Sequence, residues 1–228
     1  MKNIKALFVV LVLASATLFA QEATKDLQKF NEIKGYDQLN ITLVKASYNK
    51  AVITGDDIDK VAIDNKDGLL KVRMEIEKFL DGNETKVTIY HTEDLKLIDA
   101  NEGATITSED EIESNYLSLR SQEGAKINVK IDAKNVNIKA VTGGFITVNG
   151  ETDNQDVLIR TGGEFHGKAL ESNRADVTIF AGGKAFVNAE DYVDATVNAG
   201  GTIEIFGNPK KVKEDKKLGG EIIVRKDM

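Results

Sequence analysis

The sequence predicts an all-β protein, a parallel β-helix (solenoid) with coils of about 18–21 residues and a less regular N-terminal third. Glycine pairs recur at a nearly constant period, since their second members, Gly144, Gly163, Gly183 and Gly201, lie 19, 20 and 18 residues apart. Apolar residues alternate with polar ones around each pair, which is the period of a strand with one buried face. Short β-branched runs without a 3.6-residue pattern favour strands over helices.

The glycine pairs align successive coils. Before each pair, two apolar positions coincide in the four coils: Val136/Ile138, Val157/Ile159, Val177/Ile179 and Ala195/Val197. A second apolar run follows the pair in three of them: Ile146/Val148, Ala185/Val187 and Ile203/Ile205. We expect these side chains to face the core, with each strand paired to its equivalents about 4.8 Å away. Glycine takes positive φ at little cost, so we expect the pairs to form closely stacked bends.

The first residues resemble a secretory signal peptide, predicted for residues 1–20. Lys2 and Lys5 precede an apolar run of about 14 residues, shorter than the roughly 20 that span a bilayer. We therefore expect cleavage and export, to the periplasm, the cell surface or the medium, with no transmembrane segment in the mature chain. Residues 21–29 are polar and predicted to be a flexible lead-in. Residues 30–228 are predicted to be a single β-helix domain. Cysteine is absent, which excludes disulfides.

Residues 30–94, the first part of this predicted domain, contain strands in a less regular order. Leu39–Leu43 alternates, and Leu70–Ile76 alternates apolar with charged residues, as in a half-exposed strand. Asp81–Asn83 is a strong turn signal, and Val87–His91 is another strand. We expect these last two strands to form a hairpin across that turn.

From Leu95 the coils are regular, with single glycines at Gly103 and Gly124 in place of pairs. Near the end, Lys210–Lys217 is a charged run that we expect to be a solvated loop. Glu221–Val224 is predicted to be the last strand, and the charged tail after it is expected to blunt the open end.

The chain resembles the head GIN domain family, the putative autotransporter adhesins of Bacteroidetes-type bacteria. The resemblance lies in the glycine pairs and in four segments: Phe30–Ile33, Leu39–Val44, Phe206–Val212 and Gly219–Ile222. It extends from about residue 30 to 224, and it implies a right-handed single-stranded β-helix at the cell envelope or surface, without catalytic residues to carry over. The family often has Ser-Gly-Gly-Ser at the bend, and the residues preceding the pairs here differ: Thr142, Thr161, Ala181 and Ala199.

No catalytic, cofactor or metal site is predicted. His91 and His166 are too few, without cysteine, to suggest a metal centre, and we expect them at the surface or at strand edges. Abundant aspartates are expected at the turns for backbone reasons, rather than as a glycoside-hydrolysis pair or a calcium site. They are Asp132, Asp153, Asp156, Asp176, Asp191 and Asp194.

Five phenylalanines occupy comparable places in successive coils, and an internal stack is predicted in preference to the alternative, an exposed stripe: Phe145, Phe165, Phe180, Phe186 and Phe206. Aromatic residues make up 6% of the chain and tryptophan is absent, which disfavours avid carbohydrate binding without excluding it. The net charge of −7 argues against nucleic acid and anionic lipid as partners.

These observations predict a non-enzymatic secreted or envelope protein, an adhesin whose flat β-helix faces bind a surface protein or a glycan. Two alternatives stay open. A polysaccharide-binding or polysaccharide-active protein would need a groove with converging carboxylates and a basic group or calcium. A structural envelope component would self-associate into a homo-oligomer through its open end.

Overall fold

The computed structural model describes residues 22–82 and 84–226, so the predicted leader lies outside the described residues. The described chain is all-β, with eighteen strands and two short 3-10 turns, η1 (Ile58–Lys60) and η2 (Ile76–Lys78). Among these residues there is no α-helix, and hence none that is long and apolar enough to cross a membrane.

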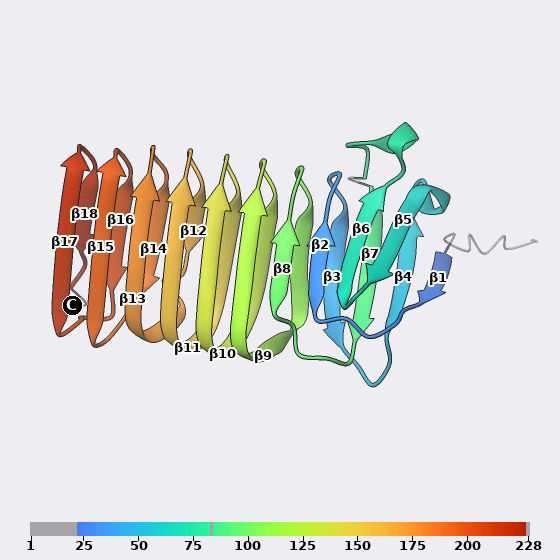
Figure 1. The fold of residues 1–228 in the computed structure, drawn as a ribbon, viewed down its shortest axis with the longest axis horizontal. Coiled ribbons are helices and arrows are strands. Elements are labelled where there is room, and N and C mark those ends of the chain that lie inside the picture. Colours follow the sequence, from blue (N-terminus) through green and yellow to red (C-terminus); the bar gives the residue numbers. More distant parts are fainter. Residues whose placement is uncertain (1–21, 83, 227–228) are drawn as a thin grey trace, which may run out of the picture.

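Residues 97–224 form a solenoid of about seven turns (Figure 1). Its coils contribute to two sheets, here called sheet A and sheet B. Three long strands run through sheet A, bend and continue in sheet B: β9 (Thr105–Gln122), β10 (Lys126–Val141) and β11 (Phe145–Arg160). Sheet A continues with β12 (Glu164–His166), β14 (Lys184–Asn188), β16 (Thr202–Phe206) and β18 (Glu221–Val224). Sheet B continues with β13 (Leu170–Phe180), β15 (Tyr192–Ala199) and β17 (Lys211–Leu218).

The solenoid is right-handed. In Figure 1 the strands of sheet B ascend in front and those of sheet A descend behind, while the chain advances from right to left. The pairings between successive coils of this part are parallel, and they are in register apart from a shift between β9 and β10 at Asn128 and Lys130. The predicted fold class is therefore confirmed.

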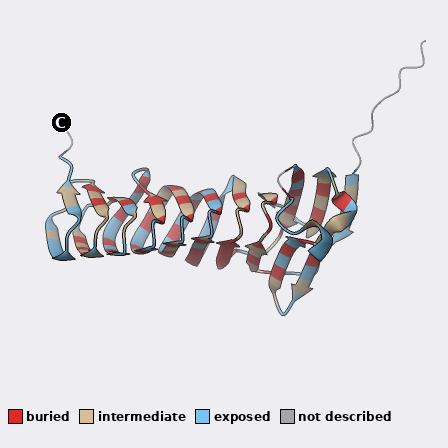
Figure 2. Ribbon diagram, turned by 90° about the horizontal axis from the view of Figure 1, so that it is seen from above, coloured by how far each residue is buried: buried red, intermediate tan, exposed pale blue. Residues whose placement is uncertain are grey.

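The core lies between the two sheets, and buried positions alternate with exposed ones along each strand (Figure 2). In sheet B one buried row is Ile138, Val157, Val177 and Ala195. In sheet A another is Ile146, Phe165, Ala185 and Ile203. Before the glycines, the matched apolar positions stack on one another in the last three coils, but the match of the first coil is wrong by two residues, because Val157 pairs with Ile138 and not with Val136.

The two glycines of a pair have different functions at the bend. Thr142 and Gly143 both have positive φ, 49° and 73°, which reverses the chain as in a primed turn. A Cβ on Gly143 would meet open space, whereas a Cβ on Gly144 would overlap the carbonyl of Ser121 in the preceding coil. The first glycine therefore serves the turn, and the second serves the close stacking of coils.

In the N-terminal part, the order of the coils along the solenoid axis differs from their order in the sequence. The first coil, β2 (Glu32–Gly35) and β3 (Asn40–Lys45), lies between two coils formed later in the sequence. On one side it pairs in parallel with β6 (Leu69–Met74) and β7 (Thr85–His91), and on the other with β8 (Leu97–Ala100) and β9. Antiparallel strands β4 (Lys50–Gly55), paired with β7, and β5 (Val61–Lys66), paired with β6, close this end.

Three local predictions are wrong. β6 and β7 do not form a hairpin, because each lies in a different sheet and pairs antiparallel with β5 and β4 respectively. The predicted lead-in forms strand β1 (Glu22–Asp26), because the free edge of β4 is available for antiparallel pairing. The charged run after Pro209 forms β17, because β15 presents an unpaired strand edge to it. In all three cases a backbone edge supplied by distant residues outweighs local polarity.

Candidate functional site

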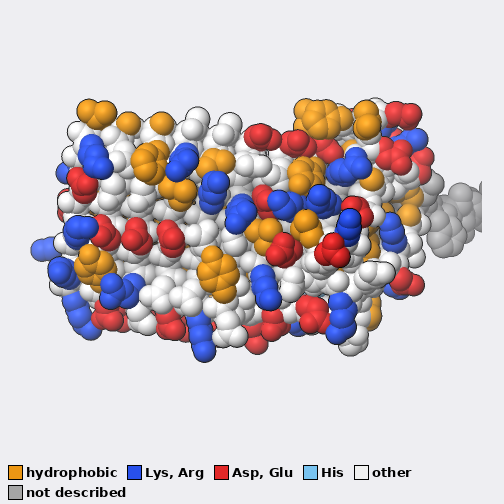
Figure 3. Space-filling model, viewed as in Figure 1, with side chains coloured by type: hydrophobic (Ala, Val, Ile, Leu, Met, Phe, Trp, Pro, Cys, Tyr) orange, Lys and Arg blue, Asp and Glu red, His pale blue; other side chains and the backbone are white. Residues whose placement is uncertain are grey.

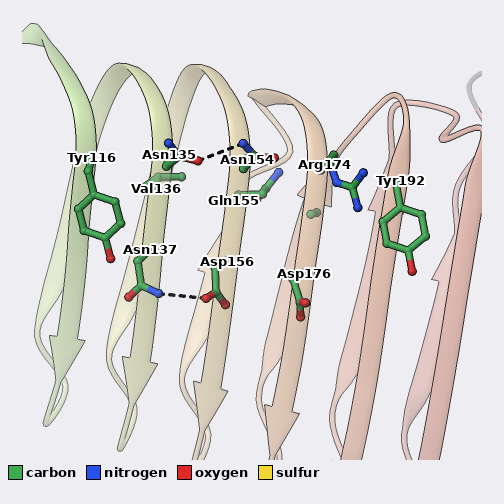
Figure 4. A pocket seen from close by; sticks show the side chains of 11 residues that line it. Tyr116, Asn135, Val136, Asn137, Asn154, Gln155, Asp156, Arg174, Asp176 and Tyr192 are labelled. Carbon is green, nitrogen blue, oxygen red and sulfur yellow. Dashed lines mark hydrogen bonds between the residues drawn. The ribbon is translucent and has the colours of Figure 1, made fainter.

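A shallow trough crosses the outer face of sheet B, near the side where the chain enters this sheet from sheet A (Figure 4). Its volume is about 340 Å³, and Tyr116 and Tyr192 stand at its two ends. Figure 3 shows the same face, with a line of acidic side chains running across the coils.

The register of the coils places one row of five side chains along the trough: Tyr116, Asn135, Asn154, Arg174 and Tyr192. Neighbouring coils are about 4.8 Å apart, so the two tyrosines, four steps apart, are separated by roughly 19 Å along the axis. Asn135 and Asn154 are short, and the hollow arises because they lie between larger side chains. The Asn154 Nδ2 donates to Asn135 Oδ1 at 3.0 Å.

A second row, two residues further along each strand, contains Asn137, Asp156, Asp176 and Asp194. Asn137 Nδ2 donates to Asp156 Oδ2 at 3.3 Å, and Lys213 Nζ pairs with Asp194 Oδ2 at 2.8 Å. Asp176 lies between these two carboxylates and has no hydrogen-bond or ion-pair partner among the described residues. The row therefore presents one free carboxylate at its centre.

Partial burial raises the pKa of Asp176, and the neighbouring carboxylates of Asp156 and Asp194 raise it further, against a smaller lowering by Lys213. Like charges in register across strands destabilise a sheet. A local feature that costs stability is a common mark of a functional surface.

The two tyrosines differ in their surroundings. Tyr116 is 55% exposed, and within the described chain no ring or cation stacks on it. Tyr192 is covered by the Arg174 guanidinium, 4.9 Å from its ring centroid, and by Lys211 Nζ at 5.7 Å. Its hydroxyl lies 3.5 Å from Asp194 Oδ2. The Tyr192 ring is thus held in place by its neighbours and partly covered by them, whereas the face of the Tyr116 ring is open to a ligand.

The prediction that the six aspartates lie at turns is wrong for five of them. Asp156, Asp176 and Asp194 lie within strands on the outer face of sheet B, because those strands begin earlier than the apolar alternation indicates. Asp132 and Asp153 also lie within strands, β10 and β11, and line a second hollow of about 260 Å³ with Glu151, Glu171 and Glu190. Asp191 lies in the bend between β14 and β15. Within residues 22–82 and 84–226 no group of histidines and carboxylates has the geometry to hold a metal ion.

The histidines have separate environments. His91 is buried, not at the surface, and its Nδ1 lies 2.9 Å from the carbonyl of Glu93. Burial lowers the pKa of His91. His166 lies on the outer face of sheet A, with its Nε2 3.1 Å from Glu164 Oε2 and its ring 4.5 Å from that of Phe145.

The predicted internal stack of phenylalanines is wrong. Of these five, Phe165 alone is buried in the core; Phe145 and Phe186 flank His166 on the outer face of sheet A. Phe180 is on the outer face of sheet B beneath Arg160, and Phe206 contacts Lys168. The reason is parity, since a shift of one residue in register sends a side chain to the opposite face of a strand.

The trough was missed although the sequence carries a signal for it. Each residue of the tyrosine-bounded row lies eight positions before the first glycine of its bend, as Tyr116 does before Gly124 and Tyr192 before Gly200. Reading down this column of the repeat would have placed both tyrosines on one face.

The family comparison decides the affiliation of the chain. The model of the family described as "Putative auto-transporter adhesin, head GIN domain" matches residues 29–209. The chain belongs to the head GIN domain family. The resemblance inferred from the glycine pairs is thereby confirmed.

Solved structures show the same fold. A putative adhesin from Bacteroides fragilis is 20% identical, with a TM-score of 0.80 over 90% of this chain and 97% of that one. A putative lipid binding protein from Parabacteroides distasonis is 17% identical, with a TM-score of 0.68 over 90% and 97%. A putative adhesin from Parabacteroides merdae is 19% identical, with a TM-score of 0.65 over 90% and 96%. No curated protein matches this head GIN chain.

Proposed function

We propose that this head GIN protein is an exported, non-enzymatic adhesin that binds its partner in the trough on sheet B. Membership of a family described as autotransporter adhesins supports adhesion and export, as does the predicted leader. The observation that carries the proposal is the trough itself, which adds a shaped, polar, aromatic-ended hollow to the face of the solenoid.

The scaffold suits a binding role. Every strand beneath the trough is hydrogen-bonded to a strand on each side, so the side chains that line it are held in a fixed array. A surface that is ordered before binding loses little conformational entropy when the partner arrives.

Binding without turnover fits the trough better than catalysis does. Asp156 and Asp176 are exposed and the hollow is open along its length, so water is not excluded from the carboxylates. The histidines lie elsewhere, and Arg174, the basic residue that lines the trough, is stacked on Tyr192.

The test is to fill the trough. Asn154→Trp places a large ring on its floor, and Asn149→Trp places the same ring on the same strand, β11, but on sheet A. The purified exported protein and both variants are applied to arrays of glycans and extracellular matrix proteins. We expect saturable binding by the parent and by Asn149→Trp, and loss of binding by Asn154→Trp. Equal binding by both variants would place the site elsewhere, and breakdown of a bound polymer would make the protein an enzyme.

A further inference from the structure

We propose that the ligand of the trough is a neutral, linear glycan that lies across the strands, parallel to the solenoid axis, with one sugar ring on Tyr116. This inference rests on the proposed function and names the chemical class of the partner. Four properties of the trough carry it.

The first is the open aromatic face. Tyr116 is exposed and unstacked, at one end of a row of polar side chains. The face of an aromatic ring carries partial negative charge and attracts the positively polarised C–H bonds on one side of a sugar ring. A single tyrosine so placed anchors one sugar and directs the remainder of the chain along the row.

The second is the periodicity of the floor. Asn135 and Asn154 repeat at the coil spacing of about 4.8 Å, as do Asp156 and Asp176 beside them. This spacing is close to the advance of one pyranose in an extended polysaccharide. Successive sugars therefore meet one pair of polar side chains per coil: Asn135 with Asn137, Asn154 with Asp156, and Arg174 with Asp176.

The third is the charge. Asp176 is an acceptor without a protein donor, and sugar hydroxyl groups are donors of the kind that a carboxylate prefers. The cations at this end of the trough are occupied: Arg174 and Lys211 stack on Tyr192, and Lys213 pairs with Asp194. An anionic glycan or a lipid phosphate would meet the carboxylate row without a free counter-charge, so the ligand is neutral.

The fourth is the lack of a peptide-binding feature. A peptide that adds a strand needs a free sheet edge, and the strands under the trough are paired on both sides. Six of its eleven lining residues are asparagine, aspartate or arginine, and its large apolar surfaces are the two tyrosine rings at its ends. Hydroxyl-rich ligands match this lining better than a protein segment does.

The test measures the affinity of neutral glucan, mannan and galactan oligosaccharides of two to eight sugars by calorimetry. Because the trough extends over four coil steps, we expect affinity to rise with length up to about four or five sugars and then to level off. Tyr116→Ala is expected to weaken binding about two- to tenfold. Asp176→Asn is expected to weaken it as well, because it replaces the free carboxylate.

Tyr48→Ala is the matched control, since Tyr48 is also about half exposed, at 50%, but lies in the N-terminal part against Tyr90. Its affinity should equal that of the parent, and a cooperative melting transition for each variant establishes that it folds. Glycan binding that Tyr116→Ala leaves unchanged would overturn the inference. Binding of matrix proteins alone, abolished by Asn154→Trp, would overturn the glycan assignment and leave the adhesin proposal standing. Binding that ignores Asn154→Trp would overturn both.

Discussion

Adjacent glycines in the same bend are constrained for different reasons. Gly162 has a φ of 74° and open space where a Cβ would lie, whereas a Cβ on Gly163 would overlap the carbonyl of Ala140 in the coil below. The first residue is limited by its own backbone conformation and the second by a neighbour about 20 residues away in sequence.

The two positions therefore respond differently to alanine. We expect Gly162→Ala to lower the free energy of unfolding by about 1–2 kcal/mol, the ordinary penalty for an L-residue in the left-handed backbone conformation. Gly163→Ala should cost about 1–3 kcal/mol more, because a backbone carbonyl has to move. Urea unfolding of both variants measures the difference. Equal costs would show that the second glycine is not there for stacking.

At the same scale, Asp176 links stability to pH. Its pKa is raised in the folded protein by burial and by Asp156 and Asp194, so folding favours its protonated form. The ionised Asp176 carboxylate therefore lowers the free energy of unfolding. This loss is absent below the ordinary aspartate pKa of about 4 and develops as pH rises through the higher pKa of the folded protein.

Asp176→Asn is therefore expected to raise the melting temperature at pH 7 and to leave it unchanged near pH 3. Melting curves across this range test the expectation, with Asp64→Asn as a control at an exposed position away from the trough. A gain of equal size at both pH values would show that the effect is not electrostatic.

At the scale of single strands, the core adapts to one oversized residue. Phe165 on β12 is in register with Ile146 on one side and Ala185 on the other, so a small neighbour accepts the large ring. The Phe165 ring also packs directly against Gly167, where a Cβ would overlap it. Phe165, Ala185 and Gly167 thus form one packing unit.

A double-mutant cycle tests this unit. Gly167→Ala is expected to cost about 1–3 kcal/mol in the parent, because the buried ring has no free space to move into. In a Phe165→Leu background the same change should cost less, because the shorter side chain vacates the space. Urea unfolding of the four proteins gives the coupling, and a cost independent of residue 165 would contradict it.

Across the whole molecule, the two ends of the solenoid are closed in different ways. Antiparallel strands β1, β4 and β5 cover the N-terminal end. At the other end, no further coil pairs with β17 and β18 within the described residues, and β17 carries Glu214 and Lys216 in register with the buried Ala195 and Val197. Charges at inward positions discourage a second copy from stacking on an open edge.

Removing these charges is expected to promote association end to end. Glu214→Ala with Lys216→Val should shift the protein to oligomers in sedimentation velocity, because an apolar layer would then face solvent. Asp215→Ala with Lys217→Val removes the same charges from the outward side of β17 and should leave the protein as it was. If both variants formed oligomers to the same extent, association would result from the general loss of surface charge and not from the loss of the inward charges.

Much of this molecule is readable from local pattern. The glycine period and the apolar alternation determine the coil length, the buried rows and the bends, because they reflect backbone and parity constraints that act within one coil. The trough row is encoded in the same way, eight positions before each first glycine, so Tyr116 and Tyr192 could have been placed on one face from the sequence alone.

What only the tertiary structure decided is which strand pairs with which. Alternation makes β6 and β7 strands, yet both take partners from other parts of the chain, and the first coil lies between two later ones. The polar residues of β1 and β17 became strands because distant edges were open to them. The hollow between Tyr116 and Tyr192 likewise depends on five coils stacking in register. Hydrogen-bond pairing between strands is non-local, and so the sequence determines the coil while the assembled sheets determine the site.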